Sequence, residues 1–524
     1  MRFKLAYSSA LSLCLLCIAC KAQESKVWQD FKTAKEKGRE PLLPDFSFAG
    51  YKYSEVAIPK AAFKKFNVVD YGAVPDDSRS DKRAIQDAIN AATKYGEGII
   101  FFPRGRYLIN TADDELDIIH ITSSKIVFQG ENRDYTVLFF EKDLPAIDPL
   151  KMWTCPYAIT TKVKLKSTLI TKIIEDARRE SNTVTVKNIN GIKKGDWLIL
   201  QVQNNAKELI DYDLNGLKIE PKWTSLIRDG VEVNERHKVK SIDENRITFE
   251  TPIHYDVKAK YNWQLLSFPN LHHIGFENLT FEGNWKKKFV HHRSAQHDGG
   301  WSILGLSKIV DSWIRDCTFK NVNRPVSISA SAATTALNID IEGAIGHNSL
   351  SAGGGSTGIL FANINDKAGM HHTTGVSGGS TTGTVIWRSK HPSNSSFESH
   401  ASQPRCTLFD NVEGGFFAGR AGGAIKNLPN HGRNLVLWNY KETDSAETNF
   451  NFVAKDSDYW RIVPPIIVGF HGSGTTFNQN EVQIAESISK PVKPESLFEE
   501  QLKLRLGRLP QWIIERKKNI DKAN

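Results

Sequence analysis

The sequence is poor in cysteine, and that scarcity excludes two kinds of stabilising framework. Six cysteines occur in 524 residues, and three of them lie within the first 22 residues. The other three are Cys155, Cys317 and Cys406. They are widely separated, odd in number and without Cys-x-x-Cys spacing, which argues against a disulfide framework and against a zinc site built on thiolates. We expect three buried thiols that behave as small apolar side chains.

The sequence also lacks the segments that are typical of membrane-spanning, nucleic-acid-binding and multidomain proteins. Beyond the first 22 residues, no apolar stretch is long enough to cross a bilayer. No run of Lys and Arg with interleaved aromatic residues occurs, so nucleic acid is not an expected partner. No linker rich in Pro, Ser or Gly separates globular blocks, so we expect one extended unit that acts as a monomer.

The first 22 residues have the pattern of an export signal. A basic start precedes an apolar stretch over residues 5–19, which is too short for a membrane helix. Two ways of processing this segment fit the sequence. The run 17–20 is similar to a bacterial lipoprotein box with Cys20 as the lipidated residue, whereas small residues also suit cleavage after Ala22. We expect an exported protein, secreted or lipid-anchored at the cell envelope or outer membrane surface, with membrane contact only through that anchor.

The charge balance favours an anionic substrate. The formal net charge of the whole chain is +9. Residues 1–22 contain three basic and no acidic residues, so the rest of the chain has 65 basic against 59 acidic residues, a charge of +6. A moderately basic exported protein attracts polyanions through its overall field. We therefore expect an anionic polysaccharide as the partner.

Residues 66–109 predict the first coils of a solenoid together with a helical cap. A strand ending in a Gly turn is followed by apolar residues at helical spacing from Ile85 to Ala92. Two short apolar strands follow at 99–103 and 105–109. The open apolar end of a parallel β-helix must be covered to prevent edge pairing, and an amphipathic helix at the first coil does this.

Farther along the chain, short apolar segments return at intervals of 21–35 residues. These strand cores start near Ile274, Ile309, Ile339, Leu360, Val385, Leu408 and Leu435. Coils of variable length indicate an all-β fold, a single-stranded right-handed parallel β-helix over residues 66–450. The period-two alternation in residues 183–258 predicts a small antiparallel β insertion. A capping box at Ser496 and Glu499 predicts a C-terminal capping helix.

In a solenoid, equivalent residues of successive coils line up along one face, and a groove along that face suits a linear polymer. The expected parts are a signal segment (1–22), a leader wrapping the solenoid (23–65), the cap and first coils (66–182), the β insertion (183–258), the main coils with the active face (259–450), and the last coils with the capping helix (451–524).

The opening segments NVVDYGAVPDDSRSDKRAIQDAINAA and GIIFFPRGRYLI resemble the start of the pectate-lyase-like superfamily of right-handed β-helix proteins. That superfamily includes lyases, hydrolases and phage tailspikes, so the resemblance implies the fold and leaves the reaction open.

Segments spread over most of the chain resemble a narrower group, the ulvan lyases of polysaccharide lyase family forty from Bacteroidetes. They include LPDFSFAGYKYSE, GHNS, MHHTTGV, HASQPRCTLFD, LPNHGRNLVLWNY and SLFEEQLKLRLG. This resemblance implies cleavage next to glucuronate or iduronate in a sulfated, rhamnose-containing algal polymer. It transfers no catalytic residue, so the roles below rest on chemistry.

Histidines mark the expected active face. Nine of the fifteen histidines lie between residues 291 and 431, mostly in loops just before a coil strand, and several arginines accompany them. The residues expected to bind substrate are His292, Arg293, His297, Arg324, His371 and His431.

Two reaction classes fit such a face. A lyase needs a cation that neutralises the uronate carboxylate and a base that removes the C5 proton. A glycosidase needs two suitably spaced carboxylates. The tandem-Asp and Gly-His-Gly signature of β-helix polygalacturonases is absent, and histidines and arginines outweigh acids on this face. This favours β-elimination. A β-helix glycoside hydrolase acting on algal or plant polysaccharide, or a non-catalytic glycan-binding protein, remains the alternative.

The spacing of three histidines along the chain suggests the catalytic roles. His347, His372 and His400 lie 25 and 28 residues apart, close to one coil each. Residues one coil apart stack at about 4.8 Å, within the span of one sugar ring. We expect His372 or His400 as the base and His347 to position the sugar. Arg405, five residues after His400, is expected to hold the carboxylate with its guanidinium fork.

A catalytic metal is not expected. His371 and His372 are adjacent, so on a strand they would point to opposite faces, and no His-x-His or His-Glu-x-x-His pattern occurs. No cofactor is required by this chemistry. Calcium is the one open option, because Asp76, Asp77 and Asp81 supply clustered carboxylates, although these residues also suit a loop that starts a helix.

Overall fold

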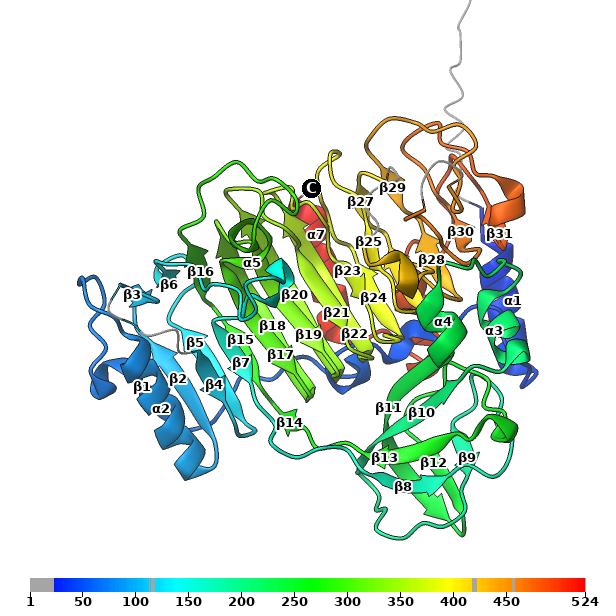
Figure 1. Ribbon diagram of the computed structural model, residues 1–524, viewed down its shortest axis with the longest axis horizontal. Coiled ribbons are helices and arrows are strands. Elements are labelled where there is room, and N and C mark those ends of the chain that lie inside the picture. The colour runs from blue at the N-terminus through cyan, green and yellow to red at the C-terminus, as the bar shows by residue number, and fades with distance from the viewer. Residues whose placement is uncertain (1–22, 113, 115–117, 417–421, 455–457, 524) are drawn as a thin grey trace, which may run out of the picture.

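The chain winds through short parallel strands into a right-handed β-helix, as Figure 1 shows for the computed structural model. The structure describes residues 23–112, 114, 118–416, 422–454 and 458–523. The predicted signal segment, residues 1–22 with Cys20, lies outside these residues. Across them, no helix combines the length and the apolar character that crossing a bilayer would need.

The longest sheet runs the whole length of the solenoid, and each strand of its main path pairs in parallel with the next. That path is β1 (Lys65–Asn67), β2 (Gly98–Phe102), β5 (Ile126–Gly130), β15 (Gly275–Glu277), β18 (Ile309–Lys320), β20 (Ala332–Glu342), β22 (Thr357–Asp366), β24 (Thr384–Trp387), β26 (Thr407–Asp410), β28 (Leu435–Trp438), β30 (Ile466–Val468) and β31 (Ile484–Glu486). Beside it lie β3 (Gly105–Ile109), β6 (Thr136–Phe140), β14 (Leu271–His272) and β16 (Thr280–Gly283).

A second parallel sheet of seven strands forms another wall of the coils. It contains β4 (Ile119–Ile121), β7 (Ile159–Thr161), β17 (Ser302–Ser307), β19 (Arg324–Ser329), β21 (Leu350–Gly353), β23 (Gly375–Ser377) and β25 (Glu398–His400). A two-stranded pair joins β27 (Glu413–Gly414) and β29 (Lys441–Glu442).

The register of the long sheet stacks one buried apolar side chain per strand into a continuous column. Its members are Phe66, Ile100, Phe128, Phe276, Ile314, Ala336, Phe361, Ile386, Phe409, Leu437 and Ile467. All belong to one core cluster or are paired directly with it. Burying a large aliphatic or aromatic side chain contributes about 1.5–3 kcal/mol to stability. The regular spacing of apolar segments in the sequence therefore corresponds to the spacing of the residues in this column.

The predicted cap is confirmed. Helix α2 (Lys82–Tyr95) packs against β1 and β2 and buries Ile85, Ala88, Ile89 and Ala92 in the core. Gly96 ends the helix with φ +103°, a left-handed conformation that glycine adopts without steric cost.

The antiparallel insertion is present and is wider than the predicted span 183–258. Its six strands are β8 (Leu169–Lys172), β9 (Thr183–Thr185), β10 (Trp197–Asn204), β11 (Val231–Asp243), β12 (Arg246–Phe249) and β13 (Gln264–Ser267), with helices α3 (Lys207–Leu214) and α4 (Thr224–Asp229). The insertion has its own apolar core and lies beside the coils (Figure 1). Its ends were misjudged because β8 and β13 pair with each other across almost a hundred residues.

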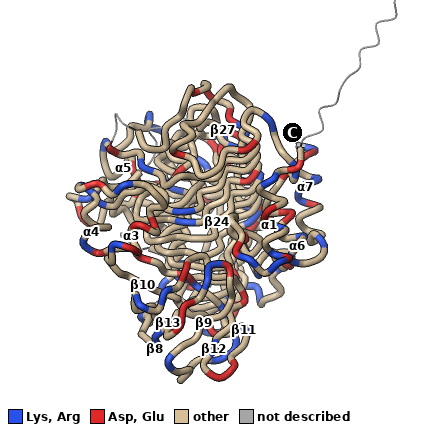
Figure 2. Tube along the Cα trace, turned by 90° about the vertical axis from the view of Figure 1, so that its right-hand side faces the viewer, with Lys and Arg blue, Asp and Glu red and all other residues tan. Residues whose placement is uncertain are grey.

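The leader and the C-terminal helices cover the outer face of the long sheet. They comprise α1 (Lys26–Glu36), α6 (Leu497–Leu506) and α7 (Gln511–Ala523). Phe31, Phe498 and Leu502 pack there against Trp387 and Trp438 of the coils. Charged residues gather on the helices, the loops and the insertion, and are sparse along the stacked coils around β24 (Figure 2).

The predicted N-cap of α6 is also present, because the Ser496 hydroxyl accepts from the Glu499 amide at 3.2 Å. The Glu499 side chain does not complete a capping box and instead binds the Arg388 guanidinium at 2.7 Å. Asp410 of the coil accepts from the first amides of α6, so the helix is docked by a carboxylate that lies far away in the sequence.

Short 3-10 turns complete the chain. They are η1 (Phe46–Phe48), η2 (Tyr51–Ser54), η3 (Val68–Tyr71), η4 (Met152–Thr154), η5 (Ala259–Tyr261), η6 (Ile425–Asn427) and η7 (Gln479–Glu481). The three cysteines of the body are buried free thiols, as predicted, and burial raises the pKa of Cys317 to about 12.

Candidate functional site

Five imidazoles from three loops meet at the edge of the seven-stranded sheet and form the histidine cluster. The loop before α5 (Ala295–Gly299) and β17 supplies two, the loop before β21 one, and the loop before β23 two. They are His291, His292, His347, His371 and His372. Their contacting rings have centroid separations of 3.6–5.7 Å. The coil geometry therefore brings together residues that are up to 81 positions apart.

Backbone hydrogen bonds between coils hold two of these loops in register. The His372 amide donates to the His347 carbonyl at 2.9 Å, and the His371 amide donates to the Gly346 carbonyl at 3.1 Å. His347 and His372 consequently stack with ring centroids 5.3 Å apart, as their 25-residue spacing predicts.

Two buried carboxylates orient the imidazoles. Nδ1 of His372 lies 2.6 Å from Oε2 of Glu398, and Nδ1 of His292 lies 2.6 Å from Oδ2 of Asp298. The Asp298 carbonyl accepts from Nδ1 of His347 at 2.9 Å. A carboxylate or carbonyl on Nδ1 selects the tautomer and leaves Nε2 for chemistry.

Neither acid was predicted as a site residue. A signal existed for both, because Asp298 follows His292 by six residues in the same loop and helix, and Glu398 lies one coil beyond β23. The sequence alone does not show that their side chains turn toward imidazoles.

Burial within the cluster keeps part of it uncharged. Desolvation, followed by the neighbouring His292, lowers the pKa of His291 to about 4. Desolvation, followed by the neighbouring His372, lowers the pKa of His347 to about 2. Both imidazoles are therefore neutral at neutral pH, and a neutral imidazole can accept a hydrogen bond or bind a metal ion through its unprotonated nitrogen.

His400 does not join the cluster, contrary to the predicted stacking. It is exposed at the end of β25 and pairs with Ser377, five residues beyond His372. The coil at this point takes 23 residues, since Gly375 pairs with Glu398, so a 28-residue spacing overshoots one turn.

Arg405 is also misplaced by the sequence prediction. Its guanidinium is buried and binds both oxygens of Asp213 in the insertion, with Nε–Oδ1 at 2.8 Å and Nη2–Oδ2 at 2.9 Å. It also lies over the Tyr255 ring. The fork that was expected to hold a substrate carboxylate instead ties the insertion to the coils.

The expected substrate-binding residues divide into two groups. His431 is fully buried between Thr407 and its own loop, and burial lowers its pKa to about 4. His297 is buried and accepts from the Val290 amide, and Arg324 binds Ser302 and the Cys155 carbonyl. These three have structural contacts.

The other three expected residues are accessible at the cluster. His292 and Arg293 are exposed, and His371 is half-buried. The loop that carries His292 and Arg293, residues 284–294, also exposes Lys286, Lys287 and Lys288, so this side of the cluster is basic.

The acidic side chains of the loop before α2 accept hydrogen bonds from backbone amides. Both oxygens of Asp81 accept from amides, those of Val74 and Leu108, at 2.8 Å. Asp76 accepts from Arg106, and Asp77 accepts from Arg79. These bonds connect the three carboxyl groups to the backbone of this loop and of β3, and Asp81 directly precedes α2.

The predicted orientation of His371 and His372, which spoke against a metal site, is wrong. His371 and His372 do not point to opposite faces, because they lie in the loop before β23, which begins only at Gly375. Their ring centroids are 4.6 Å apart. With His291 they offer three ligand atoms within 4.8 Å of one another, and His291, His292 and His347 form a second such group.

Comparison with known proteins agrees with the fold. Residues 65–154 match the family described as "Rhamnogalacturonase A/epimerase, pectate lyase-like". Residues 369–516, which contain His371, His372 and Glu398, match a "Domain of unknown function (DUF4955)". The match over residues 65–154 supports the predicted resemblance to the pectate-lyase-like superfamily, and the fold of the chain is a parallel β-helix.

Curated relatives align over short stretches. "Alginate lyase 7" of Azotobacter vinelandii is 36% identical over 74 residues, 14% of this chain and 9% of the relative. "Mannuronan C5-epimerase AlgE3" of the same organism is 34% identical over 73 residues, 14% of this chain and 4% of the relative. The chain thus spans less than a tenth of the length of these relatives.

Among solved structures, the tailspike protein gp49 from Pseudomonas phage LKA1 has a TM-score of 0.44 and 11% identity, and the match covers 77% of this chain and 64% of the tailspike. The A-module of the Azotobacter vinelandii mannuronan C-5 epimerase AlgE4 has a TM-score of 0.36 and 13% identity, with coverage of 81% and 94%. These are likenesses of fold.

Proposed function

We propose that this chain is an exported polysaccharide lyase, secreted or lipid-anchored, which cleaves a uronate-containing, sulfated, ulvan-like polysaccharide by β-elimination at the histidine cluster. The observation that carries the proposal is the pair of His292 and Asp298. The imidazole is 59% exposed beside a basic loop, while the carboxylate that holds its Nδ1 is almost completely buried.

His292 fits the role of the general base. Asp298 fixes the tautomer with a proton on Nδ1, so Nε2 carries the lone pair that takes the C5 proton. The imidazolium that forms is stabilised by the same carboxylate. As the C5–H bond breaks, its electrons form the C4–C5 double bond, the C4–O bond to the next sugar breaks, and the departing oxygen takes a proton from water to leave as a hydroxyl. We place the base here because His372 is only 7% exposed and faces His291, while His400 lies outside the cluster.

The loop that carries His292 supplies positive charge for an anionic polymer. Arg293 is exposed next to the base, and three exposed lysines precede it. Sulfate and uronate groups on a polysaccharide would be attracted to this loop before the reacting sugar is positioned. Neutral His347, held by the Asp298 carbonyl, is suited to hydrogen-bonding the sugar.

The acids at the cluster favour elimination over hydrolysis. Among the described residues there, Asp298 and Glu398 are both buried and bound to imidazoles. A glycosidase requires two carboxylates that flank the glycosidic bond. An alginate lyase and a mannuronan C5-epimerase are among the relatives that align over short stretches, which also supports an enzyme acting on a uronate polymer. The proposal that the polymer is ulvan-like rests on the sequence resemblance.

A product assay tests this function. The purified protein is incubated with ulvan, alginate, polygalacturonate and a neutral glucan, and the ultraviolet absorbance of unsaturated uronate is followed. A rise with ulvan that is absent with neutral glucan is the expected result. New reducing ends without that absorbance would indicate a hydrolase, and binding without products would indicate a glycan-binding protein; either result contradicts the proposal.

A further inference from the structure

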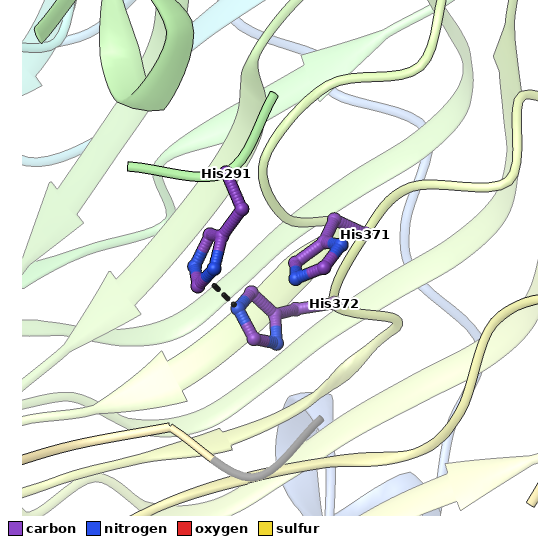
Figure 3. A group of neighbouring side chains, drawn as sticks. All are labelled: His291, His371 and His372. Atoms are coloured by element: carbon purple, nitrogen blue, oxygen red, sulfur yellow. Dashed lines mark hydrogen bonds between the residues drawn. The ribbon is translucent and has the colours of Figure 1, made fainter. Parts of the chain in front are cut away.

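Three imidazoles of the histidine cluster point toward one another across two loops. His291 comes from the loop before α5, and His371 and His372 come from the loop before β23 (Figure 3). Each offers one ligand atom, and these atoms lie within 4.8 Å of one another. We propose that His291, His371 and His372 bind a divalent transition-metal ion, with Zn²⁺ as the representative ion.

The spacing of two of the nitrogens is that of a metal site. Nε2 of His291 lies 3.4 Å from Nε2 of His372. Two nitrogens bound to one tetrahedral Zn²⁺ at about 2.05 Å lie about 3.3 Å apart. An N–H hydrogen bond is usually shorter, at about 2.7–3.2 Å. The observed separation is therefore longer than is usual for a hydrogen bond and close to that of two ligands of one ion.

Outer contacts orient His372 as a ligand. Oε2 of Glu398 lies 2.6 Å from Nδ1 of His372, and Nε2 of the same ring faces His291. Metal-binding histidines almost always donate their second N–H to a carboxylate or carbonyl in this way. Glu398 is itself buried, and its Oε2 has no hydrogen-bond partner among the described residues, so its nearest polar neighbour is Nδ1 of His372.

Two carboxylates beside the imidazoles can offset the charge of a dication. Asp298 and Glu398 place two buried carboxylates beside five imidazoles. Imidazole ligands suit zinc, copper, iron and nickel, whereas calcium and magnesium prefer oxygen.

Three protein ligands leave a coordination position open, as in catalytic zinc sites. His291 is exposed, so that position can be reached from solvent. We assign it to a carboxylate oxygen of the uronate, because the arginine expected for this task, Arg405, is committed to Asp213. This role of the ion rests on the proposed function, whereas the metal site rests on the histidine geometry alone. His292, the proposed base, is not one of the three ligands.

Metal binding is measured on the purified protein after treatment with a chelator and dialysis. Titration calorimetry with Zn²⁺ is expected to show one site, and Co²⁺ is expected to give the intense visible absorption of a tetrahedral complex. His291→Ala and His372→Ala should each weaken Zn²⁺ binding at least a hundredfold and abolish the Co²⁺ spectrum. Because His291 lies in an exposed loop, its variant tests the site even where His372→Ala perturbs folding.

Two further variants sharpen the test. Glu398→Gln should weaken Zn²⁺ binding about 10- to 100-fold, as expected for an outer-shell partner. His471→Ala removes an imidazole far from the cluster and should leave binding unchanged. No binding by the unaltered protein, or equal binding by the His291→Ala and His471→Ala variants, would overturn the metal site.

The role of the ion is tested separately from the site. The lyase assay is repeated on the chelated protein before and after Zn²⁺ is restored. A rate that falls on chelation and returns with Zn²⁺ supports the role at the uronate carboxylate. A bound ion whose removal leaves the rate unchanged overturns that role. Lyase activity in a protein that binds no metal would overturn the metal site and leave the proposed function intact.

Discussion

Nδ1 of His292 lies 2.6 Å from one carboxylate oxygen of Asp298, and the His292 amide donates to the other oxygen at 3.0 Å. The Asp298 carbonyl accepts from His347 in the adjacent loop. One buried acidic residue thereby positions an exposed imidazole and a neutral, half-buried one. This arrangement makes His292 the residue whose loss should affect the reaction most directly.

His292→Ala is expected to reduce turnover by about a hundredfold or more while the fold is retained, because that is the usual contribution of a general base. The measurement is the rate of unsaturated uronate formation, with circular dichroism as the check on folding. His400→Ala removes an exposed imidazole outside the cluster and is expected to keep the unaltered rate. A normal rate in His292→Ala, or a large loss in His400→Ala alone, would place the base elsewhere.

Arg405→Ala is expected to lower the free energy of unfolding by about 3–5 kcal/mol, because it leaves the buried Asp213 carboxylate without its partner. Denaturant unfolding measures this change. Arg293→Ala, at an exposed arginine in the loop of the cluster, should change stability by less than about 0.5 kcal/mol. Equal stability of the two variants would show that the ion pair to the insertion is not important for the fold.

The contribution of buried His431 to stability should decrease as the pH falls from about 6.5 to about 4. Folding lowers the pKa of His431 to about 4 by burial, so the unfolded chain binds a proton first on acidification. The stability due to neutral His431 is fully present above the unfolded pKa and is lost progressively below it. The loss amounts to about 2 kcal/mol at pH 5. Unfolding curves at pH 7 and pH 5 measure the loss. His431→Asn should show a smaller difference between the two pH values, and an unchanged difference would refute the assignment to His431.

The combined Lys286→Ala, Lys287→Ala and Lys288→Ala variant is expected to raise KM for the anionic polymer severalfold and to leave kcat nearly unchanged. These lysines are exposed beside the cluster and act through charge, so the effect should shrink as salt is added. Steady-state kinetics at low and high ionic strength provide the measurement. A fall in kcat at constant KM would mean that the lysines act on the chemical step.

Much of the fold could be predicted from the sequence because its signals are local and repeated. The helical spacing from Ile85 to Ala92 predicts the cap, and apolar segments at coil intervals predict the stacked column that contains Phe276 and Phe361. Ser496 was correctly predicted as an N-cap. In each case the deciding interaction depends on residues within one turn, or on the same position in the next coil.

Part of the site followed from the same periodicity. His347 and His372 were placed together because their 25-residue spacing equals one coil at that point. The prediction for His400 was wrong because coil length varies, and the next turn takes 23 residues. A constant period cannot be assumed where loops between strands differ in length.

Only the tertiary structure decided which charged groups are available for chemistry. Arg405 is bound to Asp213, 192 residues away, and Glu398 and Asp298 turn toward imidazoles. Whether a charged side chain faces solvent or a buried partner depends on desolvation and on groups brought close by folding, which short-range patterns do not encode. The sequence by itself determined the solenoid, its cap and the approximate position of the histidines. The packing of loops from different coils determined which of those histidines meet, and through which nitrogens.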